Sequence, residues 1–165
     1  MAAELDNDTV AKAYARWAPV YDLVFGAVFE KGRAAAIAAT ERIGGRILEV
    51  GVGTGISLPD YSRANRICGV DISEPMLMKA QERVAEHKMT HVEGLWVMDA
   101  EHLTFPDASF EAVLLVAVLE HTREPWRILA ETRRVLKRGG RAIMVVPNDV
   151  TMSIGRLLLR KFPVR

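Results

Sequence analysis

The chain has 165 residues, a length that suits one domain with a single buried core. Half of its residues are hydrophobic and about a quarter are charged, a composition typical of globular proteins and not of disordered ones. The single cysteine excludes an internal disulfide, and the sequence holds neither a secretory signal peptide nor an apolar run of about 18 residues. We therefore expect one cytoplasmic domain over residues 1–165.

The net charge of +1 hides an uneven distribution of charged residues. Residues 1–120 contain 11 Lys and Arg against 18 Asp and Glu, whereas residues 121–165 contain 11 against 3. In the last segment, residues 150–165, cations alternate with bulky apolar residues as in interfacial helices. One interpretation is a peripheral contact with the inner membrane, and the other is an ordinary helix that covers the sheet. We expect no nucleic-acid partner.

The first elements in chain order are an aromatic segment and a helix. Residues 1–29 include Tyr14, Trp17 and Tyr21, whose ring faces can attract a cation. The alternative for this segment is a hydrophobic N-terminal helix packed on the domain. A helical pattern follows over residues 30–43 and is predicted to end at the glycine pair after it.

The next strand, residues 46–50, runs into a glycine-rich turn, which is the most informative feature of the chain. Gly51, Gly53 and Gly55 let the backbone approach a ligand where a Cβ atom would collide. A second predicted strand ends on Asp71, and a carboxylate at this position can accept hydrogen bonds from both hydroxyls of a ribose. The sequence therefore predicts a nucleotide or nucleoside site at the carboxyl edge of a parallel sheet.

Two features of this turn indicate which cofactor binds there. The spacing is G-x-G-x-G, whereas the dinucleotide fingerprint is G-x-G-x-x-G. Glu49 also lies just before the first glycine, where it would repel a pyrophosphate and favour a cationic ligand. S-adenosylmethionine carries a sulfonium and an ammonium group and no phosphate, so we expect it as the cofactor. An NAD-dependent oxidoreductase is a remote alternative.

The remaining predicted elements alternate between helix and strand. Strands are predicted at about residues 66–70, 92–98, 111–117 and 141–146, and helices at about 56–63, 74–87 and 125–137. Such alternation predicts an α/β fold with a doubly wound, mostly parallel sheet and a ligand at the carboxyl ends of its strands.

Three motifs follow one another along the chain. They are E-V-G-V-G-T-G at residues 49–55, L-T-F-P-D-A-S-F at 103–110 and R-V-L-K-R-G-G at 134–140. In this order and spacing they resemble the motifs of the class I SAM-dependent methyltransferases over about residues 10–150. The resemblance implies a Rossmann-like sheet. Members of that family normally finish with two more strands, so we expect this chain to lack them, as a truncated form or with an exposed sheet edge.

The same resemblance implies roles for individual residues. The three glycines would carry the turn beneath the methionine part of the cofactor, Glu49 would orient its cationic end, and residues 1–29 would form a lid. Asp99 would accept a hydrogen bond from the adenine amino group, and the Ala100 backbone would donate one to a ring nitrogen. The other candidates for cofactor binding are Tyr14, Tyr21, Asp71, Ile72, Met76 and Val116. No metal ligand set is expected.

A closer resemblance concerns the methyl acceptor. Over about residues 10–110 the chain resembles bacterial phosphatidylethanolamine N-methyltransferases, in residues 14–26 (Y-A-R-W-A-P-V-Y-D-L-V-F-G), 49–55 and 73–83. This implies that the acceptor is the ethanolamine head group of a membrane phospholipid. An amine must lose a proton before it is methylated, and Tyr21 and His121 are the candidate catalytic residues, with a structural loop cap as the other interpretation of His121. The alternatives are a C- or O-methyltransferase of a quinone or other small molecule, and a SAM-binding domain without activity.

Overall fold

The computed structural model describes the backbone of residues 21–119 and 122–146, with side chains from Glu30 onward. In it, five parallel strands form one sheet in the order β3-β2-β1-β4-β5. Their bounds are Arg46–Val50 for β1, Arg66–Asp71 for β2, Val92–Val97 for β3, Phe110–Val116 for β4 and Leu136–Val145 for β5. The strand order reverses between β1 and β4, which is where ligands bind in open sheets of this kind. The predicted Rossmann-like, mostly parallel sheet is confirmed.

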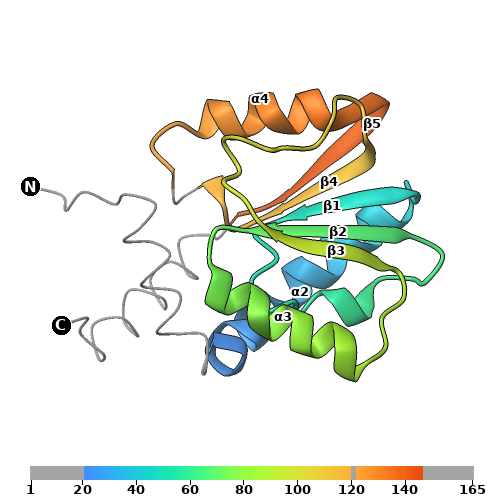
Figure 1. Cartoon of the computed structure of the whole chain (residues 1–165), viewed down its shortest axis with the longest axis vertical. Helices are drawn as coiled ribbons and strands as arrows, with labels where there is room; N and C mark the ends of the chain where they lie inside the picture. Colours follow the sequence, from blue (N-terminus) through green and yellow to red (C-terminus); the bar gives the residue numbers. More distant parts are fainter. Residues whose placement is uncertain (1–20, 120–121, 147–165) are drawn as a thin grey trace, which may run out of the picture.

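Helices cover both faces of the sheet (Figure 1). Helix α2 (Tyr21–Glu41) and helix α3 (Glu74–Glu86) lie on one face, and helix α4 (Pro125–Val135) lies on the other. Each face carries its own cluster of buried apolar side chains. The sheet is therefore doubly wound, as the alternating pattern predicts.

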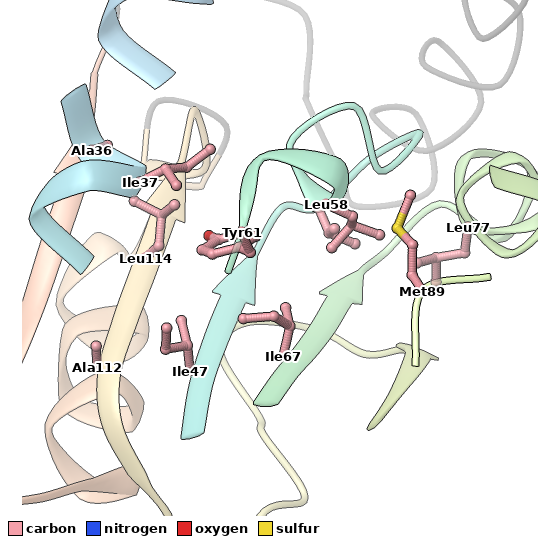
Figure 2. Packing of buried hydrophobic residues seen from close by; sticks show 11 residues of the cluster. Ala36, Ile37, Ile47, Leu58, Tyr61, Ile67, Leu77, Met89, Ala112 and Leu114 are labelled. Atoms are coloured by element: carbon pink, nitrogen blue, oxygen red, sulfur yellow. The ribbon is translucent and has the colours of Figure 1, made fainter. Parts of the chain in front are cut away.

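Alternating side chains of the central strand β1 divide the core into these two layers. Ile47 belongs to the cluster beneath α2 and α3, whereas Leu48 belongs to the cluster beneath α4. Figure 2 shows Ile47 and Ile67 projecting from their strands into the first of these layers, with Ile37 of α2 and Tyr61. Because both faces of β1 are buried, residues 47–50 of this strand are apolar except for one glutamate.

One predicted helix is wrong. Residues 56–63 form turns and a three-residue 3-10 helix, η1 (Leu58–Asp60), instead of an α-helix. Pro59 has no backbone N–H to donate, and Tyr61 already has an extended backbone with φ −77° and ψ 140°. The hydroxyl groups of Ser57 and Tyr61 both bind Glu49 of β1, which holds this segment against the sheet in a non-helical form.

Several element boundaries also differ from the predicted ones. Helix α2 is already helical at Tyr21, the first described residue, so residues 21–29 belong to the helix that was predicted for residues 30–43. Strand β5 begins at Leu136, directly after α4, and not at residue 141. The pairing of β4 with β5 shifts register between Phe110 and Ala112. Gly139, with φ of 81°, supplies the backbone conformation that this irregularity needs.

Strand β5 forms one edge of the described sheet, because among the described strands it is hydrogen-bonded to β4 alone. None of the helices that the structure describes is both long and apolar enough to span a bilayer.

Candidate cofactor site

A pocket lies at the carboxyl ends of β1, β2 and β4, where the strand order reverses. Eight of the residues predicted to bind the cofactor line it: Gly51, Gly53, Asp71, Ile72, Met76, Asp99, Ala100 and Val116. They come from five separate segments of the chain, and the parallel sheet brings them together because its strands all end on the same side.

The glycine turn forms the base of this pocket. All three of its glycines have positive φ, 78° at Gly51, 55° at Gly53 and 71° at Gly55. A Cβ atom on Gly51 would lie 2.6 Å from the side chain of Val118 and 2.7 Å from the carbonyl oxygen of Val116. The turn therefore passes directly over the end of β4, and no larger residue fits there.

Gly55 has a different role from the other two glycines. It does not line the pocket, and a Cβ atom on it would lie 2.8 Å from Leu58 Cδ1 and 2.9 Å from Ala80 Cβ of α3. Its contribution to the site is therefore the close packing of the turn on α3.

Asp71 links the turn to the second strand. One of its carboxylate oxygens accepts a hydrogen bond of 2.9 Å from Gly53 N, and the other accepts one of 2.9 Å from Ser73 N. Burial raises the pKa of Asp71, and the bonds from the Ser73 and Gly53 backbone partly offset this rise. A carboxylate offers about four acceptor positions, so Asp71 retains capacity to accept hydrogen bonds from a ribose.

One wall of the pocket is the segment that follows β3. It is joined to β2 by a 3.0 Å hydrogen bond from Met98 N to the Asp71 carbonyl. Asp99 accepts a 2.9 Å hydrogen bond from Glu101 N, and the hydroxyl of Thr122 donates to Glu101. The wall is therefore tied both to Asp71 and to the segment before α4.

The charged side chains that line the described pocket are all negative. Its lining contains three carboxylates, Asp71, Asp99 and Glu101, and no Lys or Arg among the residues that the structure describes. A pyrophosphate at this place would meet only like charge, whereas a sulfonium and an ammonium would meet opposite charge. The site fits S-adenosylmethionine and disfavours NAD. Within the described residues, no group of three His, Cys, Asp or Glu side chains gathers to hold a metal ion.

Glu49 lies apart from this pocket. Its side chain is 2% exposed and accepts hydrogen bonds from Ser57 Oγ at 2.6 Å and Tyr61 OH at 2.9 Å. Burial raises its pKa to about 7, against the lowering effect of these two hydroxyls. Because side chains alternate along a strand, Val50 lines the pocket and Glu49 points to the other face. The structure places Glu49 against the segment that follows the glycine turn, outside the lining of the described pocket, and its role towards the cofactor stays a prediction.

Three predicted site residues cannot be placed from side chains. Tyr14 and His121 lie outside the described residues, and Tyr21 is described only as the first backbone residue of α2. Sequence reasoning in turn missed eight lining residues: Val50, Val70, Met98, Glu101, Ala117, Val118, Thr122 and Ile128. Most of these adjoin a predicted residue at the end of a strand, which is the signal that identifies them. Thr122 lies just before α4 and Ile128 lies in its first turns, and no local pattern reveals that this region reaches the pocket.

The fold and the site define a class of protein, and the comparison with protein families agrees. Residues 48–144 match the family described as methyltransferase domain, so the chain belongs to this family and its cofactor is S-adenosylmethionine. The matched residues begin in β1 and end in β5, and therefore contain the whole described pocket.

Among individual proteins, the chain is similar to methyltransferases with different acceptors. It is 42% identical over 141 residues to a phosphatidylethanolamine N-methyltransferase of Cereibacter sphaeroides, covering 86% of this chain and 69% of that protein. It is 32% identical over 155 residues to a demethylmenaquinone methyltransferase of Tropheryma whipplei, covering 92% of this chain and 62% of that protein. The chain thus corresponds to only part of each relative.

One protein of known structure with the same fold is named for a different reaction. The [4+2]-cyclase SpnF superimposes with a TM-score of 0.74 at 26% identity, covering 84% of this chain and 59% of that one. The fold therefore does not fix the reaction, which depends on the groups around the cofactor.

Proposed function

We propose that this domain methylates the ethanolamine nitrogen of phosphatidylethanolamine, towards phosphatidylcholine, with S-adenosylmethionine as the methyl donor. The observation that carries the proposal is the 42% identity to a phosphatidylethanolamine N-methyltransferase over 86% of the chain. The identity to the demethylmenaquinone methyltransferase is 32% over a similar share of the chain.

The charge of the pocket supports the same choice of acceptor. Glu101 is the carboxylate of the described lining that the cofactor assignments below leave unused, and the ethanolamine head group brings an ammonium to the site. A quinone ring brings no cation and gains nothing from such a lining. Opposite charge both attracts the ammonium and favours its protonated form, so the acceptor nitrogen also needs a group that removes its proton.

Different residues of the described pocket are proposed to bind different parts of the cofactor. When bound, S-adenosylmethionine supplies an electrophilic methyl group on a positively charged sulfur. We assign the ribose hydroxyls to Asp71, the faces of the adenine to Ile72 and Met76, and the edge of the adenine to Asp99 and Ala100. These side chains orient the ligand and exclude water from it, which is the main protein contribution to a transfer between two bound groups.

The acceptor side is assigned to residues that the structure does not describe. We propose that His121 removes the proton of the ammonium or positions the head group, because in the sequence it comes five residues after Val116, the pocket-lining end of β4. We further propose that Tyr14 and Tyr21 close over the site, where their ring faces attract the sulfonium and the methylated ammonium.

A peripheral contact with the membrane would bring the lipid to this site. On α4, Trp126 is 61% and Leu129 is 43% exposed, and the exposed residues around them include Arg123, Arg127 and Arg133. Exposed apolar side chains among arginines are typical of helices that rest on anionic lipid. Thr122 and Ile128, at the start of the same region, line the pocket, so lipid bound there would lie near its mouth.

The test is methyl transfer from labelled S-adenosylmethionine to three vesicle preparations. One contains phosphatidylethanolamine, one contains phosphatidylcholine alone, and one contains phosphatidylcholine with demethylmenaquinone. We expect label in mono-, di- or trimethylated lipid from the first preparation and no label from the other two. Label in the quinone alone would replace the proposed acceptor with the quinone. Tight binding of S-adenosylhomocysteine without label anywhere would indicate a SAM-binding domain without activity on these acceptors.

A further inference from the structure

The wall of the pocket formed by residues 98–101 continues into a loop that lies along α4. This loop, residues 102–109, contains no helix or strand of its own, and its backbone must therefore find hydrogen-bond partners elsewhere. Most of those partners lie near the C-terminal end of α4, where Ala108 N and Ser109 N donate to the carbonyls of Arg134 and Val135 at 3.0 and 2.7 Å.

All five N–H groups of Arg134 donate hydrogen bonds, three to this loop and two to Glu131 of α4. Its Nη1 donates to the Phe105 carbonyl and to Asp107 Oδ1, both at 2.8 Å. Its Nη2 donates to the Leu103 carbonyl at 2.7 Å and to Glu131 Oε2 at 2.8 Å. Its Nε donates to Glu131 Oε1 at 2.8 Å, which completes a bidentate ion pair. A lysine cannot reproduce this planar arrangement.

Glu131 completes the arrangement from the other side. Its Oε2 also accepts a 2.8 Å hydrogen bond from Leu103 N, while the Leu103 carbonyl is bound by Arg134. The ion pair therefore satisfies both backbone groups of Leu103, as a neighbouring strand would do. The hydrogen bond from Arg134 holds the pKa of Glu131 below its usual range, in agreement with a charged acceptor.

Leu103 lies two residues after Glu101, the last residue of the pocket wall. The other end of the wall is fixed where Met98 N binds the Asp71 carbonyl. The four residues between these two anchors have no strand partner among the described residues, so the anchors, together with the hydrogen bond from Thr122 to Glu101, determine how far Asp99 and Ala100 extend into the pocket.

We propose that the Arg134–Glu131 pair sets the position of this wall and thereby the preference of the pocket for adenine over other purines. Both residues are positioning residues, since neither lines the pocket. The inference rests on the placement of adenine against Asp99 and Ala100 proposed above. It adds that the specificity for the base depends on an ion pair on the outer side of the wall.

The experiment compares the Kd of S-adenosylhomocysteine with that of S-inosylhomocysteine, measured by calorimetry. In the inosine analogue an oxygen replaces the amino group and the neighbouring ring nitrogen carries a proton, so the hydrogen-bonding pattern of the base edge is reversed. We expect the unaltered protein to prefer adenine by at least about tenfold, because the wrong base leaves buried polar groups unpaired.

In Arg134→Lys we expect this preference to fall by about fivefold or more, with weaker binding of the adenine ligand. Phe105 of the same loop packs edge-on against Trp96 and Phe110, with ring centroids 5.4 and 5.0 Å apart, so the loop stays attached to the core. If this variant does not fold, Glu131→Gln replaces it, because it keeps the shape of the side chain and weakens the ion pair. We expect it to reduce the preference for the adenine ligand in the same direction by a smaller factor.

Arg133→Lys is the matched control, because Arg133 is the exposed neighbour of Arg134 in the same helical turn. We expect it to keep the preference of the unaltered protein. A preference that stays within about twofold in folded Arg134→Lys overturns the inference and leaves the ion pair with a structural role only. Asp99→Ala then shows which premise failed: a reduced preference there supports the placement of the base, and an unchanged one rejects the placement as well.

Discussion

Asp71 is the residue on which the placement of the cofactor depends most. In Asp71→Ala the pocket loses the only acceptor proposed for the ribose hydroxyls, and the backbone N–H groups of Gly53 and Ser73 lose the carboxylate that binds both at 2.9 Å. The side chain is half-buried at the end of β2 and lines the pocket, so a bound ligand keeps bulk water from replacing it fully.

The magnitude follows from the type of bond. Hydrogen bonds to a charged acceptor are worth roughly 1.5–3 kcal/mol net, and each 1.4 kcal/mol is about a factor of ten in Kd. We therefore expect the Kd of S-adenosylhomocysteine to rise about 10- to 100-fold in Asp71→Ala. Asp71→Asn keeps the shape and one acceptor, and an intermediate loss is expected.

Calorimetric titration with S-adenosylhomocysteine measures both variants directly. Glu82→Ala is the control, because Glu82 is an exposed carboxylate on α3 outside the pocket lining, and its Kd should equal that of the unaltered protein. A folded Asp71→Ala protein that binds within about twofold of the unaltered protein would refute the placement of the ribose.

Three further predictions concern other parts of the site. Gly55→Ala places a Cβ atom 2.8 Å from Leu58 Cδ1 at a residue with φ of 71°, so it should lower the free energy of unfolding by about 2 kcal/mol or more. Gly139→Ala is the control, because it also has a positive φ but open space around it, and it should lower the free energy of unfolding by only about 1 kcal/mol. Chemical denaturation measures both variants. The pKa of Glu49 is raised from 4.5 to about 7, so its contribution to stability is complete below pH 4.5 and is lost as the pH rises through 7. The stability of the unaltered protein relative to Glu49→Gln should therefore fall by about 3 kcal/mol from pH 4.5 to 8, and an unchanged difference would contradict a buried, titrating Glu49. Tyr21→Ala should reduce turnover more than the melting temperature, and the reverse result would make Tyr21 a packing residue.

The sheet could be predicted because its signals are local. The central strands β1, β2 and β4 are largely apolar runs, and the positions of Gly51 and Asp71 already locate the edge where a ligand binds. The prediction of a helix over residues 56–63 failed because the competing interaction is distant in the sequence. Glu49 attracts the hydroxyl groups of Ser57 and Tyr61, and no local propensity contains that contact.

Two features of the site could not be predicted from the sequence: the direction of each strand side chain and the contacts between distant segments. Glu49 and Val50 are neighbours in the chain, yet only Val50 lines the pocket, because the direction of each side chain depends on the pleat. No sequence signal distinguishes Glu101 from a solvated charge, whereas the structure gives it a partner 21 residues away, Thr122. The Arg134 interactions with Leu103 and Phe105 span about 30 residues and have no sequence signal at all.

The central claim, that an acidic pocket at the switch between β1 and β4 selects S-adenosylmethionine over a dinucleotide, is tested most directly by thermal unfolding with each ligand. A ligand that binds only the native state at 100 times its Kd adds about 2.7 kcal/mol to the free energy of unfolding. We predict that S-adenosylmethionine and S-adenosylhomocysteine raise the melting temperature by several degrees and that NAD leaves it unchanged. A rise with NAD and none with S-adenosylhomocysteine would contradict the account.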